Sequence, residues 1–147
     1  MNRREMIAAL CAAALCNLDG VAEQKTAVEA QPRLTQSKVY RFADLPTEDR
    51  PNGQVDETVL NGTLATGERL ELHETTLPPG QMPHPAHRHL HSELMLVRTG
   101  TLEFDNNGDK VTAGPGGVFF VGSNVLHAVK CVGSVSANYY VIAIGLD

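Results

Sequence analysis

From residue 55 to the C-terminus, the sequence is a series of short β-forming runs separated by turn residues. Residues 69–74 alternate between apolar and polar side chains, which is typical of a half-buried strand. Residues 105–108 end in Asn-Gly, the pair that best supplies the two left-handed positions of a type I′ hairpin turn. Strands of this length and spacing predict an all-β barrel or jelly roll, without a substantial helix.

The other expected strands follow from the same pattern of β-branched and aromatic runs between Gly and Pro turns. Turns are expected at 78–80 and 114–117, where Gly and Pro cluster. The remaining strands are expected at 58–64, 94–97, 101–104, 118–121, 125–132 and 139–146.

Length and charge exclude several classes of protein. The chain has 147 residues, enough for one domain with its own core, and ordinary apolar and charged fractions that argue against disorder and against a membrane bundle. Its formal net charge is −5, and no run of Lys and Arg forms a basic surface. We therefore expect no nucleic-acid partner.

The N-terminal residues 1–22 resemble an export signal. Arg3 and Arg4 precede an apolar run at 6–16, which is too short to span a bilayer but suits the hydrophobic part of a secretory signal. The surrounding residues resemble a twin-arginine motif, although the usual Ser or Thr before the arginines and Lys after them are missing. We expect a cleaved signal, by this route or the general secretory one, and a periplasmic or secreted protein without membrane attachment. A cytoplasmic protein with an amphipathic first helix is the alternative.

Residues 23–54 are polar and are expected to form an N-terminal arm, while residues 55–147 form the barrel domain. Residues 38–42 alternate and could make one short strand. We expect the arm to pack on the barrel or on a second subunit, because an open barrel edge is stabilised by a cover. The chain is therefore predicted to be a homodimer, with residues 38–42 contributing to the contact.

Cysteine usage agrees with this division. Cys11 and Cys16 would leave with the signal, so Cys131 would be the only cysteine of the mature chain and could make no internal disulfide. A small buried core residue is the preferred interpretation of Cys131.

His87, His89 and Glu93 form the densest cluster of metal-binding residue types, and His127 lies forty residues downstream. In a strand, alternate side chains share a face, so His87 and His89 would point the same way and a bend would let Glu93 return toward them. Three imidazoles and one carboxylate suit divalent iron, manganese, nickel or zinc. Four such ligands would leave two positions of an octahedral shell open.

The other histidines are assigned simpler roles. His84 lies between two prolines and is expected at the rim, and His73 is expected at the barrel wall. His91 is expected to face solvent, or to replace one ligand if the register slips by two residues. One of Tyr139 and Tyr140 should point inward, because neighbouring residues of a strand face opposite ways.

The inward strand positions show no catalytic Arg or Lys, because Arg88 and Arg98 have the opposite parity to the ligands and should face solvent. Met95 and Val97 share a face with Glu93 and would line an apolar cavity. These features argue against phosphate-bearing substrates and favour a neutral or aromatic small molecule.

Two stretches resemble the sequence motifs of the cupins. Gly80-x6-His87-x-His89-x3-Glu93-x6-Gly100 resembles the first motif, with one additional residue after the first glycine. Gly116-x5-Gly122-x4-His127 resembles the second, but Gly122 stands where a proline is usual, and Cys131 where an asparagine is expected. The resemblance covers about residues 55–145. It implies a small single-domain cupin, a conical jelly roll in which His87, His89, Glu93 and His127 take the ligand roles.

Two classes of function are compatible with such a protein. The preferred interpretation is an exported metalloenzyme for a small molecule, similar to cupin dioxygenases, decarboxylases or isomerases. The alternative is a non-catalytic cupin that binds a small ligand or a metal, since fold alone does not separate the two. Manganese or iron is the preferred metal, with zinc, nickel or copper as alternatives. Folding around manganese or iron before twin-arginine export would keep stronger binders out.

Overall fold

The structure, a computed structural model, describes residues 32–145. Within this range the regular elements are strands and one short 3-10 helix, η1 (Phe42–Asp44), and no helix is long and apolar enough to cross a membrane. The strands, in chain order, are β1 (Arg33–Leu34), β2 (Thr47–Asp49), β3 (Val55–Leu64), β4 (Arg69–Leu77), β5 (Ser92–Thr99), β6 (Leu102–Asn106), β7 (Asp109–Ala113), β8 (Val118–Val121), β9 (His127–Cys131) and β10 (Ala137–Gly145).

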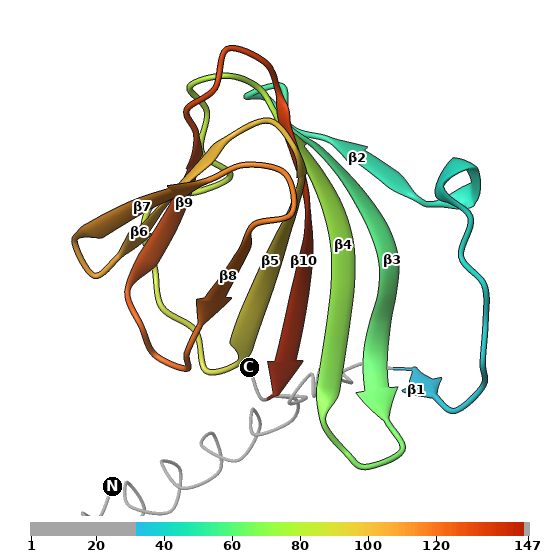
Figure 1. Cartoon of the computed structure of the whole chain (residues 1–147). Coiled ribbons are helices and arrows are strands. Elements are labelled where there is room, and N and C mark those ends of the chain that lie inside the picture. The colour runs from blue at the N-terminus through green and yellow to red at the C-terminus, as the bar shows by residue number, and fades with distance from the viewer. Residues whose placement is uncertain (1–31, 146–147) are drawn as a thin grey trace, which may run out of the picture.

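The described strands form two sheets that face each other across the core (Figure 1). The larger sheet has seven strands in the order β1-β3-β4-β10-β5-β8, with β2 also paired to β3, and the smaller has three in the order β7-β6-β9. In Figure 1, β3, β4, β10 and β5 make one long curved wall, and β6, β7 and β9 lie opposite its β5 side. This arrangement confirms the predicted all-β jelly roll.

Apart from β7, which was not among the predicted strands, the strands from β3 onward agree with the sequence prediction, with ends that differ by a few residues. The β6–β7 hairpin turns at the predicted Asn-Gly pair, where Asn107 has φ 55° and Gly108 has φ 101°. Both residues therefore adopt the left-handed backbone that a two-residue type I′ turn requires.

The predicted strand at residues 38–42 is wrong. This segment has no strand partner, and η1 begins at Phe42, whose side chain is 59% exposed. Alternation makes a strand only where a free sheet edge is available. On the outer edge of β3, Thr63 and Leu64 pair in parallel with β1, and residues 55–57 pair antiparallel with β2.

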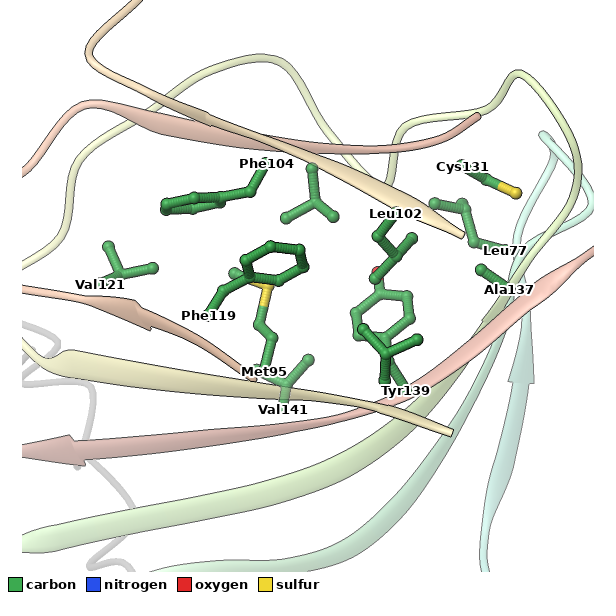
Figure 2. Close-up of a cluster of buried hydrophobic side chains, with 12 residues drawn as sticks. Leu77, Met95, Leu102, Phe104, Phe119, Val121, Cys131, Ala137, Tyr139 and Val141 are labelled. Atoms are coloured by element: carbon green, nitrogen blue, oxygen red, sulfur yellow. The ribbon is translucent and has the colours of Figure 1, made fainter. Parts of the chain in front are cut away.

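The hydrophobic core lies between the inner faces of β5, β8 and β10 and the smaller sheet (Figure 2). The rings of Phe104 and Phe119 stack there with centroids 5.1 Å apart. Cys131 is fully buried in this cluster, in agreement with a packing role, and its Sγ donates to the Val135 carbonyl. Tyr139 is the inward tyrosine of the predicted pair, with 2% of its surface exposed.

The inner face of the larger sheet changes from apolar to polar along a row of paired residues that runs from Val97 on β5 through Tyr139 and Thr75 to Asp56 on β3. The core cluster takes none of its described residues from β3 and only Leu77 from β4. The polar half of this inner face, which the core cluster does not cover, borders a cavity of about 600 Å³.

Candidate metal centre

The segment between β4 and β5 runs beside β9 and brings distant histidines together. The backbone N–H of His87 donates to the carbonyl of His127, and the N–H of His127 donates back, both at 3.1 Å. His87 and His127 are therefore directly opposite each other in an antiparallel bridge, with adjacent side chains. A third backbone hydrogen bond, from the Asn124 N–H to the His89 carbonyl at 2.8 Å, fixes the same segment two residues after His87.

The expectation that His87 and His89 lie in a regular strand is wrong. His87 makes one isolated bridge and His89 has no strand partner. Pro83 and Pro85 precede them, and a proline has no N–H to continue a ladder. The rings nevertheless meet, with a centroid distance of 5.2 Å between His87 and His89.

The third imidazole completes the cluster. The His127 ring centroid lies 4.6 Å from that of His87 and 4.7 Å from that of His89. One nitrogen from each of the three rings lies within 4.8 Å of the others. Three nitrogens at this separation can share one ion at bond lengths of about 2.1 Å.

Glu93 approaches this cluster from the inner face of β5. Its Oε2 lies 3.0 Å from His89 Nε2 and 3.4 Å from His127 Nε2, and only 9% of the residue is exposed. The structure thus brings all four residues of the predicted ligand set to one place.

The nitrogens that face away from the cluster are held by backbone carbonyls. His89 Nδ1 lies 2.9 Å from the His91 carbonyl, and His127 Nδ1 lies 3.0 Å from the Val125 carbonyl. A carbonyl can only accept, so each Nδ1 carries a proton, and Nε2 is the nitrogen of each ring that would bind a metal. Glu74, another buried carboxylate, lies apart from these rings and pairs with Arg98.

Two buried nitrogens of the cluster have no hydrogen-bond partner among the described residues, namely His87 Nδ1 and His127 Nε2. A buried polar atom without a partner is costly, and such atoms commonly mark an ion or water site. The donor set therefore fits a divalent metal, which would bind the lone pairs that the protein leaves unsatisfied.

The electrostatics of His87 and Glu93 agree with this fit. Burial, followed by the neighbouring His84, lowers the pKa of His87 to about 4, so this ring is neutral at neutral pH. Burial raises the pKa of Glu93, but the adjacent His127 and His89 outweigh it and leave the pKa lowered, so the carboxylate is ionised. Burial opposes charge on His127, whose pKa is nevertheless raised by Glu93 and the Val125 carbonyl. Neutral imidazoles with an ionised carboxylate are the forms that bind metal, so a metal would compete with a proton at His127.

The two remaining histidines of the loop flank the cluster. His84 is exposed and its ring centroid lies 4.1 Å from that of His87, at the rim where it was expected. His91 does not simply face solvent as expected, because its ring stacks on His89 at 3.7 Å and is half-buried. His89, His91 and Glu93 form a second group that could hold an ion.

The cavity beside the cluster also contains polar residues that the sequence analysis did not single out. Asp56 accepts from Thr75 Oγ1 at 2.7 Å, from Gln54 Nε2 at 2.8 Å and from Arg50 Nε at 3.1 Å. Arg50 lies in the loop between β2 and β3, so the absence of Arg from the inward strands did not exclude one from the cavity. The signal available was the Arg-Pro-Asn-Gly turn at residues 50–53.

A model of the cupin domain matches residues 73–143, a segment that contains all four converging residues. The chain belongs to the cupin superfamily. As a cupin it has many structural neighbours at low sequence identity, and a comparison with curated proteins finds no significant match.

Three solved structures illustrate the likeness. KdgF from Halomonas sp. is 17% identical, with a TM-score of 0.64 over 76% of this chain and 97% of that one. The polyketide cyclase RemF from Streptomyces resistomycificus is 18% identical, with a TM-score of 0.60 over 74% and 80%. A predicted oxalate decarboxylase from Thermotoga maritima is 23% identical, with a TM-score of 0.60 over 74% and 100%. At these identities, the likeness shows the fold.

Proposed function

We propose that the protein is a cupin metalloenzyme that holds divalent manganese or iron through His87, His89, Glu93 and His127 and acts on a small molecule. The observation that carries this proposal is the convergence of three imidazoles and one carboxylate, with two orphaned ring nitrogens, at the wall of a cavity of about 600 Å³. A pocket of this size accommodates a small metabolite.

The bound metal would supply a Lewis acid with open coordination positions, suited to dioxygenase-, decarboxylase- or isomerase-like chemistry. The chain's own residues would orient the ligand. Asp56 and Glu71 present carboxylate acceptors to the cavity, while the Arg50 guanidinium is already paired with Asp56 and Glu48. Because the cavity presents carboxylate acceptors and its guanidinium is already paired, it favours a neutral ligand with hydroxyl or amine donors over an anionic one. The presence of two enzymes among the cited neighbours supports a catalytic role for this chain as well.

Export and dimerisation are part of the same proposal. The expected signal at residues 1–22 lies outside the described residues, and we propose from its sequence that the protein is exported to the periplasm or secreted. The proposed homodimer is supported by apolar side chains on the outer face of the larger sheet, where Val118 is 57% exposed and Phe120 is 65% exposed. Exposed apolar groups that gather on one face favour a protein partner.

Metal analysis of the purified protein beside His127→Ala and His84→Ala tests the site. Wild type and His84→Ala should each bind about one equivalent of manganese or iron, whereas His127→Ala should lose it, because a lost ligand weakens the site far more than a changed rim residue. Equal metal content in all three proteins would reject the ligand set. Oxygen uptake with small phenols and keto acids then separates an oxygen-dependent enzyme from a binding protein.

A further inference from the structure

Glu71 on β4 lies across the cavity floor from the metal ligand Glu93 on β5. Ala143 on β10 pairs with Glu93 on one side and with Glu71 on the other, so the three residues form one row on the inner face. Two strand spacings separate the Cα atoms of the two glutamates by about 10 Å. Ala143 stands between them in this row, where Arg69 and His91 border only a small pocket. The larger cavity opens over the next row, in which Val141 pairs with Met95 and with His73.

His73 belongs to the same wall and is coupled to Glu71. The two residues face the same way on β4, and His73 Nδ1 lies 3.2 Å from Glu71 Oε1. The other carboxylate oxygen, Oε2, accepts from Asn61 Nδ2 at 3.4 Å, so the carboxylate is held from two sides. A carboxylate at Nδ1 fixes the proton on that nitrogen and makes Nε2 the acceptor of the neutral ring. Both residues border the cavity that Glu93 and His127 also border.

We propose that His73 is the acid–base residue of this site, positioned by Glu71, and that it exchanges a proton with a hydroxyl or ammonium group of a ligand bound between the metal and β4. The inference rests on the proposed function, because it needs a ligand anchored at the metal centre. In the step, the ligand's O–H or N–H bond breaks, its electron pair stays on the ligand, and an N–H bond forms at His73 Nε2. The proton returns when the ligand is released.

The charges around His73 favour this step. Glu71 faces it from β4, Asp56 faces it from β3, and the neighbour on β10 is the apolar Val141. Because Asp56 is already engaged by Thr75 and Arg50, Glu71 is the group that orients the ring. Among the described residues, the rings that contact the proposed ligands His87, His89 and His127 belong to other histidines and to Phe104, so His73 stands apart from that cluster.

The chromogenic diol 4-nitrocatechol is a suitable probe, because it binds metal ions and its absorption band reports its ionisation. Protein loaded with Mn²⁺ under nitrogen is titrated with the probe across pH. In His73→Gln the pH at which the bound probe is half-ionised should rise by about one unit, since the proton acceptor is lost. Glu71→Gln should shift it in the same direction by less. Glu103→Gln, which changes a carboxylate of β6 that pairs with Lys110 outside the cavity, should leave it unchanged.

An unchanged ionisation midpoint in His73→Gln at equal metal content would overturn the role of His73, as would failure of the probe to bind the metal-loaded wild type. The position of the His73 proton, measured by nitrogen-15 NMR on the metal-free protein, gives a second test. A proton on Nδ1 supports the proposal and a proton on Nε2 overturns it. Absence of metal binding would reject the proposed function instead, and the NMR result would still decide the geometry of the pair.

Discussion

Val141 on β10 stands between Met95 on β5 and His73 on β4 in one row of paired residues, and all three line the cavity. In Val141→Phe the added carbon atoms would point into the space beside His73. The ligand cavity is about 600 Å³ in all, so one phenylalanine removes only a part of it, but the part is the one that lies between β5 and β4.

The size of the effect follows from the cost of overpacking. Extra methylene groups in a filled space cost about 1–3 kcal/mol. If a ligand lies between the proposed metal site and β4, it must meet this cost when it binds, which corresponds to an affinity loss of about five- to 150-fold. The proposed metal ligands lie on the loop before β5, on β5 and on β9, so the metal content should change little.

Isothermal titration with 4-nitrocatechol, together with metal analysis of the same samples, measures both quantities. Ile142→Leu is the matched control, because Ile142 is the neighbouring residue on the outer face, paired with Leu72 and Leu94, and the exchanged side chains are isomeric. Val141→Phe should weaken probe binding at constant metal content, and Ile142→Leu should change neither. Equal probe affinity in Val141→Phe and wild type would refute a ligand site between the proposed metal site and β4.

Three further predictions concern charge, backbone and assembly. The hydrogen bond from His73 is the largest cause of the lowered pKa of Glu71, so His73→Gln should raise that pKa, as carbon-13 NMR of the carboxyl group would show. A lowered carboxyl pKa contributes stability above the unfolded-state pKa and loses it as pH falls through the folded-state pKa, so wild type should lose more stability on acidification than His73→Gln. Gly100→Ala should destabilise the fold by about 1–3 kcal/mol in urea denaturation, because Gly100 has φ 75° and an added Cβ would lie 2.5 Å from Ala137 Cα, whereas Gly67→Ala, with open space around it, should cost less. Sedimentation at micromolar concentration should give a dimer, and a monomer alone would contradict the proposed assembly.

The barrel strands were predictable from sequence because alternation and turn residues are local signals. The Asn107-Gly108 turn, for example, needs only two residues with left-handed backbone, which the sequence names directly. The missed segment at 38–42 failed for a non-local reason, since its alternation was adequate but the edge of β3 was already paired with β1 and β2. Edge availability is a property of the assembled sheet.

The candidate ligands could be found from spacing, but the way they meet could not. His87 and His127 are brought together by two backbone hydrogen bonds across forty residues of sequence, a pairing that side-chain patterns do not encode. The cavity partners Arg50 and Asp56 were missed because charged residues in a polar segment resemble a solvated loop. Their engagement with each other appears only when the β2–β3 hairpin is folded against β4.

The alternation of polar and apolar residues in β4 was predicted from the sequence. In the structure the polar residues face the inside of the barrel and the apolar ones face outward, which is the reverse of the usual arrangement for a barrel wall. Glu71 and His73 face inward, to the cavity, while Leu72 faces outward in a row with Ile142 and Leu94. A strand with this polarity cannot be stabilised by the core alone, because its apolar side chains lie on the face away from it. This reversed polarity of β4 links the proposed ligand site with the proposed homodimer, which were predicted from different parts of the sequence. In the proposed function, the polar inner face would bind a ligand, and a second subunit would bury the apolar outer face.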